Sequence, residues 1–242
     1  MPELSIIIPC LDDADRLTDL LPRLEDICDA TGLDVETIIV DDASRDGSLG
    51  VAQEMQGGYP RLGIRVLHRF KPGLGYGTVL RYGIAHATGR FCIAVAADLS
   101  DPLHLMVEMI KRARQGAQLV QCSRYLRAED RQSVSTLRRA YQSMFRAATA
   151  VAVGKTISDA TFGFQLFDRV YVTSLGLSSN RFSVCAEVAL KVILDGGRIE
   201  WVPGREGVRH SGHAKFLMRR ELHGFVFVVL RAWAHRMGVL WF

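Results

Sequence analysis

Residues 35–48 read VETIIVDDASRDGS, and this stretch decides the fold class. Its first six residues are apolar or β-branched apart from one glutamate, which is typical of a strand buried in a sheet. Asp41 and Asp42 follow where that strand ends, and a turn containing Gly47 leads into a segment with helical spacing. A strand, an acidic turn and a helix in this order indicate one unit of an α/β fold.

The same alternation continues in both directions along the chain. The ranges expected to be strands are Leu4–Ile8, Val35–Val40, Ile64–Leu67, Phe91–Ala96 and Leu119–Cys122, with later ones near Phe162–Phe167 and Arg198–Val202. The ranges expected to be helices are Asp13–Ala30, Ser48–Met55, Gly77–Ala87, Leu103–Arg114, Thr136–Val153 and Ala186–Leu194. This alternation predicts a mostly parallel central sheet with flanking helices on both faces. Ligands of such sheets bind beyond the carboxyl ends of the strands.

Composition sets the limits of this interpretation. The chain has 242 residues, of which 48% are hydrophobic and 23% charged, so we expect a globular fold. The net charge of +4 gives little reason to expect a nucleic-acid partner. Five scattered cysteines without a C-x-x-C pair, and a start with no basic signal-peptide region, indicate a reducing, cytoplasmic setting. We expect one domain over residues 1–215 and a tail over residues 216–242.

Acidic residues gather where the fold places the ligand. Asp41 and Asp42 end the second strand, and Asp98 and Asp101 follow the fourth. Carboxylates are hard oxygen ligands that suit Mg²⁺ or Mn²⁺ bridging a diphosphate. The alternative is that single aspartates only start turns, since Asp101 before Pro102 is also a good helix cap.

A dinucleotide-binding fold is the main competing interpretation. That fold needs a glycine-rich first strand-to-helix turn that admits a pyrophosphate. Residues 9–13 read PCLDD, with no glycine and two negative charges. Gly73, Gly75 and Gly77 come after the third strand and lack the G-x-G-x-x-G spacing, so this fold is excluded.

In this order, the motifs resemble those of the family 2 glycosyltransferases, and most closely the dolichol-phosphate mannose synthase and polyprenyl-phosphate glycosyltransferase group. The matching stretches are IIIP at 6–9, IVDDASRDG at 39–47, GLG at 73–75, ATG at 87–89, DLSDP at 98–102, SRY at 123–125, DATFGF at 159–164 and RHSGHAK at 209–215. Arg139, Ser143 and Glu187 match as single positions. The resemblance covers about Leu4 to Lys215 and implies a GT-A fold.

The resemblance also implies roles for particular residues. The residues expected to bind the nucleotide sugar are Pro9, Leu11, Asp13, Asp41, Asp42, Gly73, Gly75, Asp98 and Lys215. Expected to be catalytic are Asp98, Asp101, Arg124 and Arg209. The metal ligands would be Asp98, Ser100 and Asp101, and the acceptor phosphate would lie on Arg124, Arg139 and Ser143. Arg139 and Ser143 are four residues apart and so share one helix face. The reaction implied is inverting transfer of a sugar from a GDP- or UDP-sugar to a polyprenyl or dolichyl phosphate.

One departure from the family pattern keeps two alternatives open. The family has Asp-x-Asp before the metal, whereas residues 96–98 here are Ala-Ala-Asp, so the first carboxylate is missing. A nucleotide-sugar-binding pseudoenzyme is one alternative. A glycosyltransferase with a saccharide or other hydroxyl acceptor is the other, and it needs a carboxylate base such as Asp101 or Asp159.

The tail is both apolar and basic. Phe225–Leu230 is a continuous apolar run, but it is too short to span a bilayer and Arg231 follows it. We expect an amphipathic helix in the membrane interface, with Trp233 and Trp241 at headgroup depth. A helix packed on the domain is the alternative. The protein would then be peripheral to the cytoplasmic face of the membrane, and its homo-oligomeric state is left open.

Overall fold

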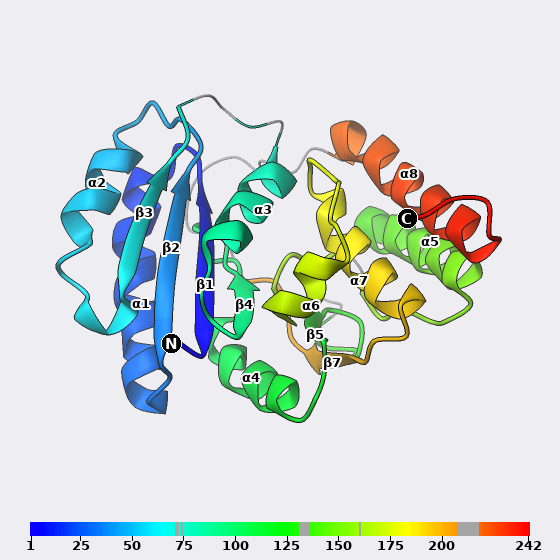
Figure 1. Cartoon of the computed structure of the whole chain (residues 1–242), viewed down its shortest axis with the longest axis horizontal. Helices are drawn as coiled ribbons and strands as arrows, with labels where there is room; N and C mark the ends of the chain where they lie inside the picture. The colour runs from blue at the N-terminus through cyan, green and yellow to red at the C-terminus, as the bar shows by residue number, and fades with distance from the viewer. Residues whose placement is uncertain (71–72, 74, 131–135, 160, 208–217) are drawn as a thin grey trace.

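The computed structural model describes residues 1–70, 73, 75–130, 136–159, 161–207 and 218–242 (Figure 1). The strands are β1 (Leu4–Cys10), β2 (Val35–Asp41), β3 (Ile64–His68), β4 (Phe91–Ala94), β5 (Leu119–Ser123), β6 (Gln165–Asp168) and β7 (Ile199–Pro203). The α-helices are α1 (Ala14–Thr31), α2 (Ser48–Met55), α3 (Tyr76–His86), α4 (Met106–Arg114), α5 (Thr136–Val153), α6 (Arg169–Ser174), α7 (Ser183–Leu194) and α8 (Met218–Arg236). Two short 3₁₀ turns, η1 (Pro60–Leu62) and η2 (Leu103–Leu105), complete the described elements.

The seven strands form one sheet in the order β3-β2-β1-β4-β6-β5-β7. All neighbouring pairs are parallel except those of β6, which runs antiparallel to β4 and β5. The predicted mostly parallel sheet is therefore confirmed. Strand β1 lies between β2 and β4, so the chain order reverses at its two sides, and ligands bind outside the carboxyl ends at such a point. The pairing of Cys10 with Asp41 brings the ends of β1 and β2 together there.

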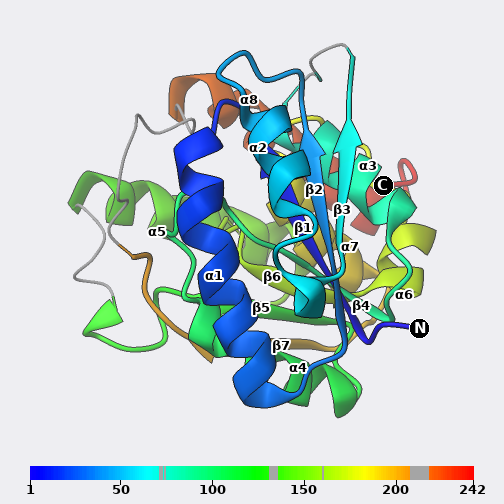
Figure 2. The ribbon, with the colours of Figure 1, turned by 90° about the vertical axis from the view of Figure 1, so that its left-hand side faces the viewer.

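Alternate residues of β1 serve two different cores, because successive side chains of a strand point to opposite faces. Ile6 and Ile8 belong to a core shared with α1 and α4, whereas Ile7 belongs to a core shared with α3 and α7. Figure 2 shows α1 and α2 in front of the first three strands. Both faces of the sheet are thus covered, as the continuous apolar runs predict.

The region after β4 departs from the predicted strand Phe91–Ala96. The strand ends at Ala94, and two residues later the Ala96 N–H donates to the carboxylate of Asp101 rather than to a neighbouring strand. Leu99 in the same turn has a φ of 59°. The helix predicted from Leu103 accordingly begins as the 3₁₀ turn η2 and becomes α-helical at Met106. This turn places Asp98 just beyond the carboxyl end of β4.

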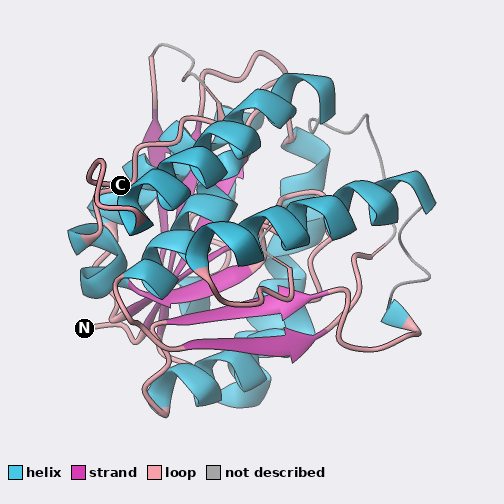
Figure 3. Cartoon of the chain, turned by 90° about the vertical axis from the view of Figure 1, so that its right-hand side faces the viewer, coloured by secondary structure: helices cyan, strands magenta, loops and turns pink. Residues whose placement is uncertain are grey.

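The tail forms helix α8, which packs against α5 and α7 (Figure 3). Phe225, Val228 and Ala232 on its inner face are buried in the same core as α7. The outer face carries exposed apolar side chains at helical spacing, namely Leu222, Val226, Leu230 and Trp233, and exposed Met237 follows just beyond the helix. None of the described helices is both long enough and apolar enough to cross a bilayer. The predicted boundary at residue 215 lies outside the described residues.

Candidate active site

A cavity of about 200 Å³ opens beyond the carboxyl ends of β1 and β2. Its walls are Pro9, Cys10, Leu11, Asp42, Gly75, Tyr76, Val79, Arg181, Phe182 and Glu221. Four of the residues expected to bind a nucleotide sugar are in this set, and we call the space the donor cavity. It lies at the switch point that the sheet order defines.

Asp41 lies beside the donor cavity at the end of β2 and is fully buried. Its Oδ2 is 2.9 Å from Nδ1 of His68. Its Oδ1 is also buried and has no hydrogen-bond partner among the described residues. A buried carboxylate oxygen without a partner costs free energy unless a donor reaches it. Asp41 is therefore an acceptor suited to an N–H or O–H group of a ligand.

Asp42 organises the loop that follows β3. Its Oδ1 accepts a hydrogen bond of 2.7 Å from the Gly73 N–H and lies 3.3 Å from Nη1 of Arg69. Gly75 has a φ of 132°, which a side chain would disfavour. A Cβ on Gly77 would come within 2.3 Å of the Ser179 carbonyl oxygen. Gly75 and Gly77 therefore allow the start of α3 to pack closely on residues 179–181.

Asp13 has a local structural role in this geometry. The Leu11 N–H donates to its Oδ2 at 3.1 Å, and its Oδ1 forms an ion pair with Arg16. Its own N–H donates to Oγ of Ser48 at 2.8 Å. These contacts hold the β1-to-α1 turn and so set the position of Leu11 on the cavity wall.

The three expected metal ligands share one turn after β4. Oδ1 of Asp98 accepts hydrogen bonds from the N–H and the hydroxyl of Ser100, at 3.1 and 2.5 Å. Asp101 instead points back to the Ala96 N–H, at 2.7 Å. Within the described part of the chain, no three His, Cys, Asp or Glu residues converge on a common point. Asp98 thus offers one carboxylate, which Mg²⁺ accepts when phosphate oxygens and waters supply the remaining ligands.

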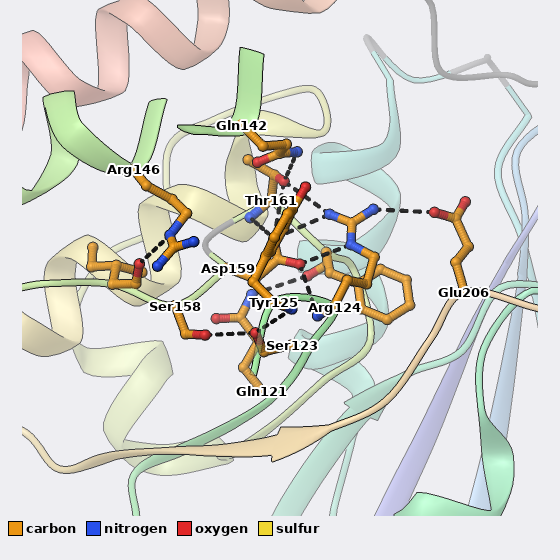
Figure 4. Close-up of polar contacts among 12 residues, drawn as sticks. Gln121, Ser123, Arg124, Tyr125, Gln142, Arg146, Ser158, Asp159, Thr161 and Glu206 are labelled. Carbon is orange, nitrogen blue, oxygen red and sulfur yellow. Dashed lines mark hydrogen bonds and ion pairs between the residues drawn. The ribbon is translucent and has the colours of Figure 1, made fainter. Parts of the chain in front are cut away.

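Arg124 is fully buried at the end of β5, with three residues accepting its hydrogen bonds (Figure 4). Its Nε and Nη2 donate to the two oxygens of Asp159 at 2.8 and 3.1 Å. Nη2 also donates to Oγ1 of Thr161, and Nη1 donates to Glu206, both at 3.1 Å. Burial alone would lower the pKa of Arg124, but the charges of Asp159 and Glu206 outweigh it and raise that pKa.

In this geometry protein groups enclose Arg124, and its expected contact with a phosphate stays a prediction. Its guanidinium group has no solvent-exposed surface, and four of its five N–H groups donate to protein oxygens. A phosphate would reach it only by displacing one of these protein oxygens, such as that of Glu206 at Nη1. Arg124 joins β5 to Asp159 and Thr161 and, through Glu206, to the segment that follows β7.

Arg139 and Ser143 both stand exposed on α5. Arg139 donates through Nη2 to Oγ1 of Thr136, one turn earlier, at 3.1 Å. Gln142, between them in sequence, is buried and donates to Thr161, which ties α5 to the Arg124 network. The two predicted acceptor-phosphate residues are thus accessible, on a helix whose inner face is fixed. Arg209 and Lys215 lie outside the described residues.

Arg181, Phe182 and Glu221 line the donor cavity but lie in none of the family-matching stretches. Glu187, fully buried on α7, explains how the first two arrive there. It accepts hydrogen bonds from the N–H groups of Ser178 and Ser179 at 2.9 and 2.7 Å, which fixes residues 178–182. Phe182 then stacks on Tyr76 with ring centroids 4.5 Å apart. In the sequence, the match of Glu187 to the family is the signal for this region. Glu187 holds residues 178–179 in place but does not itself line the donor cavity.

A second, larger cavity of about 550 Å³ lies beside the turn that carries Asp98. Its walls are Pro102, His104, Leu105, Glu108, Arg112, Arg127, Asp130, Val202, Pro203, Gly204, Arg205 and Gly207. Arg112 is held by Glu108 at 2.9 Å. Arg127 and Arg205 are exposed in this lining, where three arginines outnumber the two acids Glu108 and Asp130.

Comparison with known proteins shows distant relatives with glycosyl-transfer functions. Over 215 residues the chain is 25% identical to dolichol-phosphate mannosyltransferase of Pyrococcus furiosus, covering 88% of this chain and 59% of that protein. It is 30% identical over 156 residues to undecaprenyl-phosphate 4-deoxy-4-formamido-L-arabinose transferase of Edwardsiella ictaluri, covering 64% of this chain and 46% of that protein. The chain thus spans about half to three-fifths of the length of these relatives.

Solved structures show the same fold at lower identity. Glucosyl-3-phosphoglycerate synthase of Mycobacterium tuberculosis, solved with Mn²⁺, UDP and glucosyl-3-phosphoglycerate, is similar with a TM-score of 0.63 and 20% identity, covering 99% of this chain and 81% of that one. Mannosyl-3-phosphoglycerate synthase of Rubrobacter xylanophilus has a TM-score of 0.68 and 18% identity, covering 98% and 74%. The family model for glycosyl transferase family 2 matches residues 5–176. With a sheet-edge donor cavity, strand-end carboxylates and this match over most of its length, the chain belongs to glycosyl transferase family 2 and has the GT-A fold.

Proposed function

We propose that this chain is an inverting glycosyltransferase that moves a sugar from a nucleotide-diphosphate sugar to a polyprenyl phosphate at the cytoplasmic face of a membrane. The observation that carries the lipid acceptor is the surface around α5. Arg139 and Ser143 are exposed on the same helix as exposed Tyr141, Met144 and Val151. A cation and a hydroxyl beside an apolar helix surface suit a phosphate attached to a hydrocarbon chain.

The base and ribose of the donor would occupy the donor cavity. Pro9, Leu11 and Gly75 form its walls, and Asp42 with Gly73 holds the adjoining loop. The partnerless Oδ1 of Asp41 would accept a hydrogen bond from the nucleoside. The residues expected at the diphosphate are Arg209 and Lys215.

A divalent cation, Mg²⁺ or Mn²⁺, would lie on Asp98, with Ser100 and Asp101 in the same turn. When bound, it would neutralise charge on the diphosphate leaving group. Ser100 orients the Asp98 carboxylate through two hydrogen bonds, and Asp101 fixes the turn through the Ala96 N–H. We assign Asp101 a positioning role, because a lipid phosphate needs no protein base.

The acceptor phosphate itself would be the nucleophile. A phosphate monoester has a second pKa of about 6 and is largely dianionic at neutral pH. Arg139 and Ser143 would orient it for in-line attack on the anomeric carbon, which inverts the configuration there. Arg124 would act through Asp159 and Thr161 by holding α5 in place.

The apolar surface of α5 and α8 supports seating on a membrane. The two helices lie side by side at the same end of the molecule (Figure 3). Trp233 is 48% exposed and Phe227 is 60% exposed, so aromatic rings are available at headgroup depth. Apolar side chains in contiguous exposed patches mark protein or membrane contacts.

A soluble anionic acceptor is the second candidate, favoured by the basic rim of the larger cavity. Arg127 and Arg205 at its opening would suit a phosphorylated or carboxylated hydroxyl compound. In that case the acceptor hydroxyl would need a base, for which Asp101 or Asp159 would have to serve.

One assay separates the candidates. The detergent-solubilised chain is offered UDP- and GDP-sugars, with and without Mn²⁺, and either a short polyprenyl phosphate or phosphorylated and plain saccharide hydroxyl acceptors. Product on the lipid phosphate supports the proposal. Product only on hydroxyl acceptors contradicts it, and donor binding without turnover indicates the pseudoenzyme that Ala96 leaves open.

A further inference from the structure

A third cavity, of about 400 Å³, lies between residues 178–183 and helix α8. Its walls are Ser178, Ser179, Asn180, Arg181, Ser183, His223, Gly224, Phe227, Val228 and Arg231. Its lining thus includes three serines, one asparagine, one histidine and two arginines. No carboxylate is among the described residues that line it. A lining of donors and cations without acids is suited to an anion.

Two carboxylates lie behind this lining, and both are already engaged. Glu187 is fully buried and accepts hydrogen bonds from the Ser178 and Ser179 N–H groups. Glu221 is 5% exposed, accepts from the Phe182 N–H at 3.2 Å, and lies 3.6 Å from Nη1 of Arg181. Neither lines the cavity, so its surface charge is positive.

Arg231 is the best-placed cation of this cavity. Its Nη1 donates to Oγ of Ser178 at 2.8 Å, and its guanidinium lies over the rings of Phe227 and Phe242 at 5.7 and 5.2 Å. No carboxylate of the described residues lies within ion-pair distance of it. The aromatic contacts hold the side chain in place and leave its remaining N–H groups available.

The cavity adjoins the apolar outer face of α8. Phe227 is 60% exposed on the cavity wall, and Leu230, 57% exposed, follows within one helical turn. An anion that binds here would therefore have apolar side chains directly beside it. A phosphodiester headgroup whose acyl chains lie along α8 satisfies both parts of this surface, whereas free phosphate uses only the cavity.

We propose that this cavity binds the phosphate group of an anionic membrane lipid, separate from the sugar acceptor, and so orients the chain on the bilayer. The inference rests on the membrane seating in the proposed function. Arg181 lines both this cavity and the donor cavity, so the lipid would contact the segment that walls the nucleotide.

The test is co-sedimentation of the full chain with phosphatidylcholine vesicles that contain or lack phosphatidylglycerol. Arg231→Gln should lower the preference for phosphatidylglycerol roughly fivefold, the effect of one basic residue near a charged surface. Arg231→Lys should retain most of the preference. The matched control is Arg23→Gln, which removes one exposed cation from α1 on another part of the molecule.

A gain-of-binding variant guards against misfolding as the explanation. His223→Arg adds a cation at the exposed rim and should strengthen the phosphatidylglycerol preference. Equal effects of Arg231→Gln and Arg23→Gln, or no gain from His223→Arg, overturn the proposal. Calorimetric binding of inorganic phosphate by the unmodified chain, without any lipid preference, overturns it in favour of a soluble ligand.

A separate assay tests the proposed function. Transfer to a short polyprenyl phosphate in neutral detergent is measured on the unmodified chain. If the unmodified chain shows no transfer but its preference for phosphatidylglycerol depends on Arg231, the acceptor assignment is refuted and the headgroup site is supported. If the chain transfers sugar to the polyprenyl phosphate but has no such lipid preference, the acceptor assignment is supported and the headgroup site is refuted.

Discussion

The two halves of the sheet place their candidate ligand-binding groups in different ways. At β1 and β2 the functional groups follow directly from strand ends, and Cys10 pairs with Asp41 in the sheet itself. At β5 and β7 the corresponding groups are buried, and Arg124 is held by Asp159 and Glu206. The exposed polar groups of that half come from the helix α5 instead. In the first half the candidate binding groups lie at strand ends, whereas in the second half the group at the strand end is buried and helps to hold a helix in place.

The largest effect is expected at the turn after β4, which lies between the two halves. Asp98→Asn should reduce sugar transfer roughly 100-fold or more, because it removes the carboxylate that we propose holds the cation there. Initial rates with saturating Mn²⁺ measure this. Asp19→Asn, at an exposed position on α1, is the control. Transfer that survives Asp98→Asn would show that the cation site lies elsewhere.

The comparison predicts that Arg124 matters chiefly for stability. Arg124→Gln leaves Asp159 buried without its partner and should lower the unfolding free energy by about 3–5 kcal/mol. Urea denaturation measures this change. The double variant Arg124→Met with Asp159→Leu should recover part of the loss. An Arg124→Gln protein as stable as the parent, but inactive, would restore the direct phosphate role.

Arg139 should behave in the opposite way. Arg139→Gln should raise KM for the lipid phosphate about tenfold or more, since hydrogen bonds to charged groups contribute about 1.5–3 kcal/mol. The KM for the nucleotide sugar and the urea midpoint should not change. Lys155→Gln, an exposed cation just beyond α5, is the matched control. Equal changes in both KM values would place Arg139 at the donor.

The smallest effect on activity is expected at Glu36, near the start of β2 and so at the opposite end of that strand from Asp41. Burial alone would raise the pKa of Glu36, but hydrogen bonds from Ser5, Thr88 and Arg65 outweigh it and lower the pKa to about 2. Because this pKa is below that of an unfolded glutamate, Glu36 stabilises the fold above about pH 4.3, and the contribution disappears as the pH falls through 2.

Glu36→Gln should therefore be less stable than the parent at pH 7, and the difference should shrink from pH 5 toward pH 2. Unfolding free energies at several pH values measure it, and transfer activity per folded molecule should stay constant. A difference that is independent of pH would contradict the assigned pKa.

The first half of the fold could be predicted well from the sequence. Strand-length apolar runs ending in acidic residues give the parallel order, and a strand end fixes the direction of the side chains that follow it. Asp41 and Asp42 were found in this way. The end of β4 was placed two residues too late, because the Asp101 carboxylate captures the Ala96 N–H, a contact that propensity does not contain.

The second half could be predicted less completely, for a physical reason. Arg124 was identified as important, but its burial depends on Asp159 and Glu206, which are 35 and 82 residues away in sequence. Arg181 and Glu221 reach the donor cavity from an irregular segment and from the last helix. Such placements follow from tertiary contacts, for which a single sequence carries no periodic signal.

Helix α8 also limits how this protein can be engineered. Removing an apolar terminal helix is a common way to make a membrane-associated enzyme easier to handle. Here that deletion would remove Glu221 from the donor cavity and Phe225 from the core. Replacing exposed Leu230 and Trp233 with polar residues would leave both in place. Polar substitutions on the exposed face of α8 are therefore a better choice than deletion of the helix.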